Sequence, residues 1–421
     1  RRLANLSPEQ QELLTLLLER EGLGTPPLSS TQQRLLATTQ LARGTPLGNV
    51  PFAFRVSGPL RIPLLNRSLT EIARRHEVLR TTFHEIDGRA FPAVAPSLDV
   101  SLPIVDLRAV PAHERDADAL RIVTTEARRP LDVERGPLLK GQVVRLAEDE
   151  WILLLVTHHL VTDGWGVRLL LQELGALYRS SHRGVPARLP DLSAQYCEYA
   201  RRERQWLASD AVNAQLAYWR ARLAGSRAIK LPLDHPRPGR PTWTSAIEGL
   251  QLSPHLSNAL RTLSLREGVT LYTVLLAAFQ TLLQRYSLQS DVLVGTTISR
   301  RNRREWEALV GNFGNNLLLR ADFSGDPPFR ELLRRACDVV LGAFAHPDVP
   351  LERIIAAAQQ QGEVGSVPPF QVMFILRDST LAQNLDLGGL ALRPIPVAAG
   401  ATALDLTLDI TDGEAGLSGY L

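Results

Sequence analysis

A pair of adjacent histidines is the part of the chain best suited to chemistry. His158 and His159 open the sequence HHLVTDGWG, in which Asp163 and Gly164 follow closely. A neutral imidazole accepts a proton near neutral pH, so a histidine here can act as a general base. Asp163 can hold a cationic partner or cap a helix. The spacing therefore indicates functional groups presented on a turn.

The flanking segments predict a strand, a turn and a helix around these histidines. Residues 151–157 read WILLLVT, an unbroken apolar run that is typical of a strand buried on both faces. In residues 167–178, one side of the expected helix carries Leu170, Leu171, Leu174, Leu177 and Tyr178. If extended geometry continues through the histidine pair, the two rings point to opposite sides. Only one of them can then face a given cavity.

Each of these residues also has an ordinary structural interpretation. A buried histidine is often a hydrogen-bonded core residue, Asp163 could simply cap the helix, and Gly164 could be a turn residue. The whole pattern is more specific, because these separate roles would have to coincide at a set spacing. A metal site is not expected, since adjacent histidines cannot easily bind one ion and no nearby Cys or His completes a zinc set.

Composition narrows the class of protein. The 421 residues, 44% of them hydrophobic and 22% charged, predict a globular protein with two or three core units. No apolar run reaches the ~18 residues that span a membrane, and no secretory signal precedes the first helix, which favours a cytoplasmic location. The net charge is +3 with both signs interspersed, which argues against a nucleic-acid partner. Cys197 and Cys337 are far apart and predict no disulfide framework.

The two ends of the sequence suggest a piece of a longer polypeptide. The chain starts at Arg1, its only methionine is Met373, and residues 417–421 are strand-like with no closing turn signal. Residues 1–24 predict a helix and a linker, with Ser7 as the start of a capping box. This helix could be a linker element or could dock a partner.

The order of elements predicts a mixed α/β architecture in two halves, residues 25–190 and 191–421. Strands are expected at residues 52–57, 138–145, 151–157, 291–299, 317–321, 371–376 and 404–410, and helices at 64–76, 117–126, 192–207, 211–223, 253–266, 269–286 and 329–345. Residues 231–241 contain four prolines and predict a connecting segment. The sequence has no phosphate loop, dinucleotide fingerprint or nucleophile elbow.

Several motifs occur in a fixed order along the chain. They lie at residues 28–35 (LSSTQQRL), 75–83 (RHEVLRTTF), 158–166 (HHLVTDGWG), 195–206 (QYCEYARRERQW), 294–302 (VGTTISRRN), 311–316 (GNFGNN), 345–353 (AHPDVPLER) and 370–376 (FQVMFIL). From about Leu28 to Leu421 the chain resembles the condensation domains of nonribosomal peptide synthetases. It departs from them at Leu36, Asn316 and Pro347, where tryptophan, threonine and glutamine are common. These departures concern local packing and the substrate pocket.

The resemblance implies a fold and an activity. The fold would be a V of two chloramphenicol-acetyltransferase-like subdomains with a central tunnel. Peptidyl carrier domains would dock at both tunnel mouths and deliver thioesters on phosphopantetheine arms, beside an adjacent adenylation domain. The amine of the downstream aminoacyl thioester would attack the upstream acyl or peptidyl thioester to form an amide. No metal or directly bound cofactor is implied, and the excised domain is expected to be monomeric.

The resemblance also assigns roles to the site residues. His159 would face the tunnel, with His158 in a structural role. An α-amine has a pKa of roughly 7.7–8, so the base would matter less for generating the nucleophile than for removing a proton from the tetrahedral intermediate. Asp163 would pair with Arg301 to hold the turn, and Gly164 would serve either backbone geometry or passage of the pantetheine arm. Four further residues are expected along the tunnel: Trp165, Asn315, Arg75 and Arg80.

Three alternative functions remain at this stage. An epimerization domain shares the histidine pair and would need a second acid or base from the other half, although Trp165 fits condensation better. A free-standing acyltransferase would use soluble donors, against which the cut-out appearance of both termini argues. A non-catalytic recruitment platform would keep the fold, but the intact HHxxxDG pattern argues against it.

Overall fold

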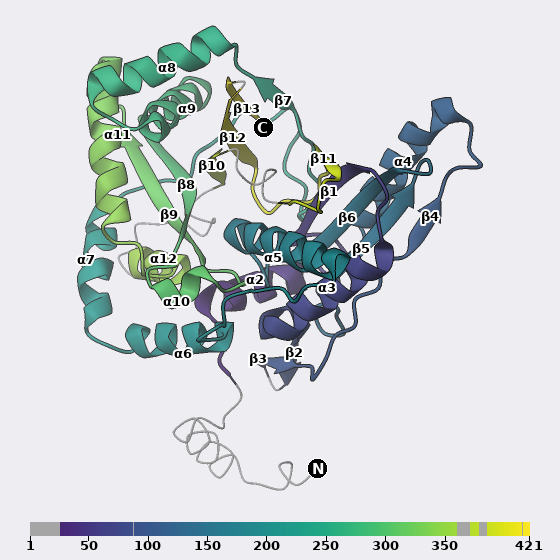
Figure 1. Ribbon diagram of the computed structural model, residues 1–421. Coiled ribbons are helices and arrows are strands. Elements are labelled where there is room, and N and C mark those ends of the chain that lie inside the picture. Colours follow the sequence, from purple (N-terminus) through teal and green to yellow (C-terminus); the bar gives the residue numbers. More distant parts are fainter. Residues whose placement is uncertain (1–25, 87, 360–370, 379–384, 415) are drawn as a thin grey trace, which may run out of the picture.

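The computed structural model describes residues 26–86, 88–359, 371–378, 385–414 and 416–421. The helix expected within residues 1–24 lies outside these ranges. The described chain confirms the mixed α/β architecture, with two halves that lie side by side and are each built on a sheet (Figure 1). Within the described ranges, no helix has the length and apolar character needed to cross a membrane.

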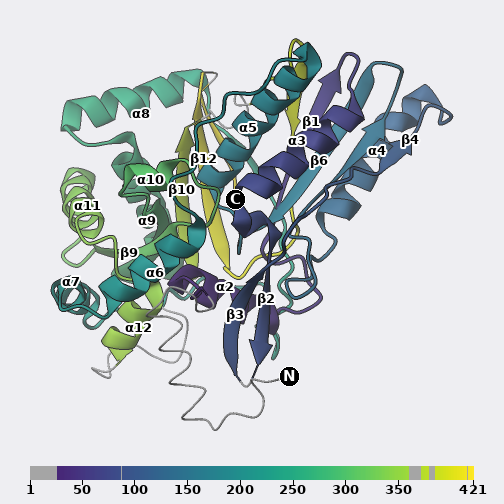
Figure 2. The same ribbon diagram turned by 60° about the horizontal axis from the view of Figure 1, so that its bottom comes forward.

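The first half contains a five-stranded sheet in the order β11-β1-β6-β5-β4. Its strands are β1 (Asn49–Ser57), β4 (Ile104–Asp106), β5 (Leu139–Arg145), β6 (Glu150–His158) and β11 (Ala391–Ile395). Helices α3 (Ile62–Arg75) and α5 (Gly164–Arg183) cover one face, and α4 (Ala112–Ala127) covers the other. The β2–β3 hairpin, Thr81–Ile86 and Arg89–Val94, projects beyond the sheet (Figure 2).

Strand β6 lies at the centre of this sheet, paired antiparallel to β1 and β5. Its side chains alternate between two cores: Leu153 and Leu155 join the core that includes Leu170 of α5, whereas Ile152 and Leu154 join the core under α4. An apolar residue at every position is what burial on both faces requires. The strand expected from WILLLVT is therefore confirmed, and it carries the histidine pair to its end.

The second half contains a six-stranded sheet in the order β7-β13-β12-β10-β8-β9. Its strands are β7 (Gly249–Gln251), β8 (Asp291–Ser299), β9 (Gly314–Asp322), β10 (Val372–Asp378), β12 (Leu406–Gly413) and β13 (Gly416–Tyr420). Strand β10 runs parallel to both β12 and β8. The helices of this half are α7 (Ala211–Leu223), α8 (Pro254–Glu267), α9 (Leu271–Ser287), α11 (Phe329–Phe344) and α12 (Leu351–Gln359).

Three helices lie where the halves meet: α2 (Ser30–Leu41), α6 (Tyr196–Leu207) and α10 (Arg304–Glu307). Helix α2 begins with a capping box between Ser29 and Gln32. Leu36, which stands where the family commonly has tryptophan, is buried in the core of the first half. The departure at Leu36 is therefore accommodated as a smaller apolar side chain in a packed interior.

The expected boundary at residue 190 is wrong for part of the chain. Strand β11 pairs with β1 and so returns residues 391–395 to the first sheet. Buried side chains that follow residue 190 also complete the first core: Tyr196, Tyr199, Trp306, Leu309, Val310, Phe313, Leu385 and Leu387. Because β11 is an edge strand of five largely solvent-accessible residues, ALRPI, its sequence lacks the apolar alternation that predicts a strand.

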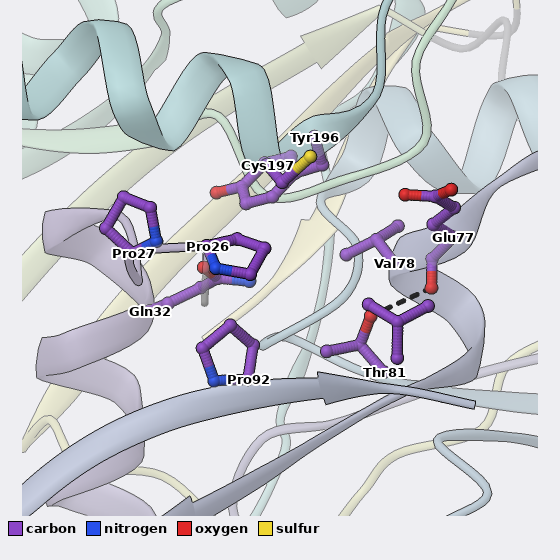
Figure 3. Close-up of a pocket in the computed structure, with 10 residues that line it drawn as sticks. Pro26, Pro27, Gln32, Glu77, Val78, Thr81, Pro92, Tyr196 and Cys197 are labelled. Carbon is purple, nitrogen blue, oxygen red and sulfur yellow. Dashed lines mark hydrogen bonds between the residues drawn. The ribbon is translucent and has the colours of Figure 1, made fainter. Parts of the chain in front are cut away.

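A small pocket of about 30 Å³ lies between the start of α2, the β2–β3 hairpin and the start of α6. It has room for one or two water molecules. Figure 3 shows Pro26 and Pro27, which precede α2, opposite Val78 and near Cys197 of α6. Burial raises the pKa of the Cys197 thiol above its ordinary value. The thiol is therefore protonated at neutral pH and acts here as a small apolar side chain.

Candidate active site

His158 is the last residue of β6, and its ring is buried. Its Nδ1 accepts a hydrogen bond from the Leu160 amide at 3.1 Å. The ring lies against Gly48, where a Cβ would come within 2.4 Å of Nε2, and Gly48 also has φ +93°. The Gly48 carbonyl accepts from the His159 amide at 2.7 Å. Glycine is therefore needed at position 48 both for backbone conformation and for space.

The surroundings of His158 keep its ring neutral. Burial, followed by the neighbouring His159 ring, lowers the pKa of His158 to about 3. Its Nε2 makes no hydrogen bond to a described residue. A contact with the Leu47 backbone opposes the lowering of the pKa. A ring that stays neutral and is enclosed on all sides fits a structural role.

His159 points the other way, into space that solvent can reach. Its side chain is exposed, yet protein surrounds it closely enough that burial lowers its pKa from the ordinary value. These two facts agree if the ring lines an internal, water-accessible space. The Thr162 carbonyl and the Asp163 charge raise the pKa of His159, whereas the charges of Arg377 and Arg34 lower it further. The neutral form is thus favoured at neutral pH.

The tautomer of His159 follows from its backbone contact. Nδ1 lies 3.3 Å from the Thr162 carbonyl oxygen. Because a carbonyl only accepts hydrogen bonds, the neutral ring carries its hydrogen on Nδ1 and its lone pair on Nε2. The Asn312 side-chain amide, which comes from the second half, donates to the His159 carbonyl at 2.7 Å. This cross-half contact fixes the backbone that presents the ring.

Asp163 serves as a helix cap and as an ion-pair partner at the same time. Its Oδ1 accepts from the Gly166 amide at 2.7 Å and caps α5. Its Oδ2 lies 2.6 Å from Arg301 Nη1 and accepts from the Phe313 amide at 3.0 Å. Arg301 Nη2 in turn donates to the carbonyls of Leu309 and Gly311. The pair therefore fastens the histidine turn to residues 309–313 of the second half.

Gly164 is the first residue of α5, and it is exposed. It is not among the glycines with positive φ, and a Cβ at this position would meet only Arg377 Nη1, at 3.9 Å. By contrast, a Cβ on Gly166 would come within 2.6 Å of Thr162 Oγ1. Backbone strain therefore does not explain the glycine at position 164. Open space in front of the residue remains the proposed reason.

Three of the residues expected along the tunnel make local structural contacts. Asn315 is buried, and its amide donates to the carbonyls of Pro347 and Val349. Arg75 pairs with Glu173 of α5 at 3.3 Å. Arg80 donates to the Ala95 carbonyl and lies 3.6 Å from Glu77. These side chains are held by local backbone and ion-pair partners, and their place along the tunnel stays a prediction.

Trp165, the fourth of these residues, joins the two halves. Its indole Nε1 donates to the Glu307 carbonyl of α10 at 2.8 Å, and the Arg168 guanidinium stacks 3.7 Å from the ring centroid. The side chain is 37% exposed. Trp165 thus connects α5 to α10, and its expected place on the tunnel wall stays a prediction.

Two arginines near His159 were missed by sequence reasoning, Arg34 of α2 and Arg377 of β10. Arg34 Nε lies 2.8 Å from Glu352 of α12, and Arg377 binds Asp409 of β12. Arg34 occurs in the LSSTQQRL motif, which could have pointed to it, whereas Arg377 lies near the end of β10, a strand with no polar pattern. Among the described residues, no three His, Cys, Asp or Glu side chains gather as a metal site requires.

Comparison with known proteins gives this arrangement its family. The model of the condensation domain family matches residues 23–418. The chain belongs to that family. It is 43% identical to one of the linear gramicidin synthase proteins of Brevibacillus parabrevis over 86% of this chain and 7% of the relative. Phosphinothricin tripeptide synthetase PhsC of Streptomyces viridochromogenes is 35% identical over 100% of this chain and 40% of the relative.

The condensation domain thus spans less than half the length of these two synthetases. The family is one of acyltransferase-type enzymes of nonribosomal peptide synthetases. The X-domain from teicoplanin biosynthesis has a TM-score of 0.83 and 26% identity, covering 94% of this chain and 89% of that one. The first condensation domain of the calcium-dependent antibiotic synthetase has a TM-score of 0.79 and 20% identity, covering 94% and 90%. The latter comparison supports the fold, including its chloramphenicol-acetyltransferase-like halves.

Proposed function

We propose that this condensation domain forms an amide between an upstream carrier-bound acyl or peptidyl thioester and the amine of a downstream carrier-bound aminoacyl thioester. The observation that carries the proposal is the presentation of His159. Its Nδ1 is turned to the Thr162 carbonyl, and its Nε2 lone pair is left for the accessible space. The proposed base is therefore neutral and fixed in orientation before substrate arrives.

The reaction proceeds by addition and elimination. The amine nitrogen bonds to the thioester carbon, and the carbonyl electron pair moves to oxygen. His159 Nε2 takes the proton from the added nitrogen, the oxygen pair returns, and the carbon–sulfur bond breaks to release the upstream pantetheine thiolate. The thiolate then takes a proton from imidazolium or water. No oxidant or metal enters this balance.

Two effects differ in size in this mechanism. An α-amine with a pKa of roughly 7.7–8 is partly neutral at pH 7, so the base contributes ~10²–10⁴-fold. Holding both thioesters in reacting geometry can supply an effective molarity of ~10⁵ M or more. We therefore rank positioning of the two tethered substrates first and proton transfer by His159 second.

The partners follow from the family. Relatives are large multimodular synthetases, which supports carrier domains on both sides and a neighbouring adenylation domain as partners. The substrates arrive on phosphopantetheine arms, and no resident cofactor is proposed. The excised domain is proposed to act as a monomer. We assign His158, Asp163 and Arg301 to holding the active-site turn, and Gly164 to leaving room for the pantetheine arm.

The test is single-turnover amide formation between aminoacyl and acyl pantetheine thioesters loaded on the two neighbouring carrier domains, measured by mass spectrometry. His159→Ala should slow the reaction ~10²-fold or more with an unchanged melting temperature. The wild-type rate should fall as pH drops through the lowered pKa of His159, because only the neutral ring accepts a proton. Wild-type turnover in His159→Ala would remove the base role.

Two other functions are separated by the same assay. An epimerization domain would exchange the α-proton of a tethered residue in deuterated water without joining the two substrates. A recruitment platform would bind a partner without forming product, and a complex of the teicoplanin X-domain with OxyB among the structural neighbours gives this option a specific basis. The available lone pair of His159 favours catalysis over recruitment, and Trp165 after Asp163 and Gly164 favours condensation over epimerization.

A further inference from the structure

Arg377 reaches the candidate active site from the second half of the molecule. On β10, its Nε lies 2.8 Å from Asp409 Oδ1 and 2.9 Å from Oδ2, and its Nη2 lies 2.6 Å from Oδ2. Asp409, on the adjacent strand β12, is only 3% exposed and also accepts from the Tyr420 hydroxyl at 3.2 Å. The buried Asp409 carboxylate therefore binds the Nε and Nη2 side of the guanidinium. This contact fixes the plane in which Nη1 lies.

The remaining terminal nitrogen of Arg377 faces the active site. Nη1 makes no hydrogen bond to another described residue, and it lies 3.9 Å from the point where a Cβ of Gly164 would stand. The Arg377 side chain is 39% exposed. His159 and Gly164 are exposed as well. Gly164 and Arg377 Nη1 are thus neighbours, and the Arg377 charge also acts on the His159 ring. The imidazole belongs to the first half and the guanidinium to the second.

The other two arginines near His159 each pair with a carboxylate of their own. Arg301 directs Nη1 and Nη2 to Asp163 and to the carbonyls of Leu309 and Gly311. Arg34 pairs with Glu352 across the junction. Among these three arginines, Arg377 is the one whose Nη1 lies next to Gly164 without a described hydrogen-bond partner. Arg377 lies near the N-terminus of α5, where the helix dipole is also positive. The charge of Arg377 and the helix dipole therefore both favour a negative charge at this point.

We propose that Arg377 Nη1 donates a hydrogen bond to the oxyanion that forms when the acceptor amine adds to the donor thioester. This proposal rests on the proposed condensation function. On addition, the carbonyl oxygen gains a full electron pair, and a fixed cation beside it is worth more in this state than in the ground state. When the intermediate collapses, the pair returns to carbon and the thiolate leaves. The Arg377 proton never transfers, since guanidinium stays charged.

The arrangement assigns the two chemical tasks to different halves. His159, which belongs to the first half, accepts the proton. Arg377, which belongs to the second half, stabilises the oxyanion. The alternative role for Arg377 is structural, as a clamp between β10 and β12 through Asp409. The two roles predict different kinetics, because an oxyanion donor acts on the transition state whereas a clamp acts on the stability of the fold.

The experiment measures kcat, KM and melting temperature for Arg377 variants with carrier-bound substrates. Arg377→Gln should lower kcat ~10²–10³-fold with little change in KM, the loss typical of one oxyanion donor. Because this variant leaves Asp409 buried without its partner, the double variant Arg377→Gln with Asp409→Asn provides a folded control and should show the same kcat loss. Asp409→Asn alone keeps the donor and should lose less activity.

Chemical rescue separates a catalytic donor from a clamp. Adding guanidinium at millimolar concentration to Arg377→Gly should restore part of kcat. The variant Arg377→Lys should have a higher kcat than Arg377→Gln, because lysine keeps a cationic donor. The acid limb of the rate profile should also move to higher pH in Arg377→Gln, because Arg377 is one of the groups that lower the pKa of His159. A folded Arg377 variant with wild-type kcat, or a loss that follows melting temperature and resists rescue, would overturn the proposal.

The outcome is distinguishable from failure of the proposed function. If the wild-type domain forms no amide with any carrier-bound pair, the condensation function itself fails. If the wild type forms amide and His159→Ala is impaired while Arg377 variants are not, only the oxyanion role is lost.

Discussion

At the scale of single residues, His158 and His159 show how strongly surroundings decide the role of an imidazole. His158 is enclosed and has a pKa of about 3, whereas an unfolded chain would give it the ordinary value of 6.5. The unfolded state therefore binds more protons between these values, and stability falls as pH drops below 6.5. Between neutral pH and pH 5 this residue should cost about 2 kcal/mol of unfolding free energy.

The measurement is urea unfolding at pH 7.5 and at pH 5. His158→Asn keeps an acceptor for the Leu160 amide but cannot gain the proton, so it should lose about 2 kcal/mol less than the wild type over this interval. His113→Asn is the matched control, because the His113 side chain is 80% exposed. Equal pH dependence in the wild type and His158→Asn would show that His158 is not held neutral by the fold.

The residues found by sequence differ from those missed in a physical way. The histidine pair and Asp163 lie in one local motif, so its spacing located them, and the family resemblance assigned Arg301 as the partner of Asp163. Arg377 and Asn312 act through strands and loops that meet only after folding, and no local pattern shows which way they point. Motif membership also did not reveal that the Asn315 amide donates to two backbone carbonyls.

At the scale of elements, the first turn of α5 tests why glycine follows Asp163. A Cβ at position 164 would make only an ordinary contact with Arg377, but one at position 166 would come within 2.6 Å of Thr162 Oγ1 and 3.3 Å of the Gly311 carbonyl. Gly164→Ala should therefore change stability by less than ~1 kcal/mol. Gly166→Ala should cost ~1–3 kcal/mol by overpacking.

Activity then separates space from backbone geometry at position 164. Gly164→Trp should remain folded but lose the reaction with a carrier-bound donor, while a short soluble thioester retains some activity. Gly166→Ala serves as the control in which stability and both activities fall together. Equal loss with both donors in Gly164→Trp, accompanied by unfolding, would contradict the pantetheine-passage role. Thermal melts and parallel mass-spectrometric assays give both readouts.

Strands and helices were predicted correctly where their buried side chains form a regular apolar pattern in the sequence. Strand β8 has the expected bounds, Asp291–Ser299, and α7 has Ala211–Leu223, because each presents an apolar pattern of the right period. Strand β11 escaped notice since its pairing partner, β1, lies more than three hundred residues earlier in the chain. Pairing over such a distance depends on the whole fold rather than on the five residues of the strand.

At the scale of the whole molecule, the two halves depend on each other although the sequence divides them at residue 190. The core of the first half includes Trp306, Phe313 and Leu387, which are 2%, 0% and 1% exposed. Burying a large apolar side chain of this kind is worth roughly 1.5–3 kcal/mol. Removal of several such side chains together with β11 costs an amount comparable with the ~5–15 kcal/mol that stabilises an ordinary domain.

We therefore expect residues 25–190 expressed alone to form a loosely packed state, with weak near-UV circular dichroism and binding of a hydrophobic dye. Co-expression with residues 191–421 should restore a cooperative melt, because the second fragment returns β11 and the missing apolar side chains. The intact chain nicked by a protease in the loop before α6 is the matched control, since its fragments start in place. A cooperative transition for the first fragment alone, near that of the intact chain, would show that the first half folds independently and that the shared core contributes little to its stability.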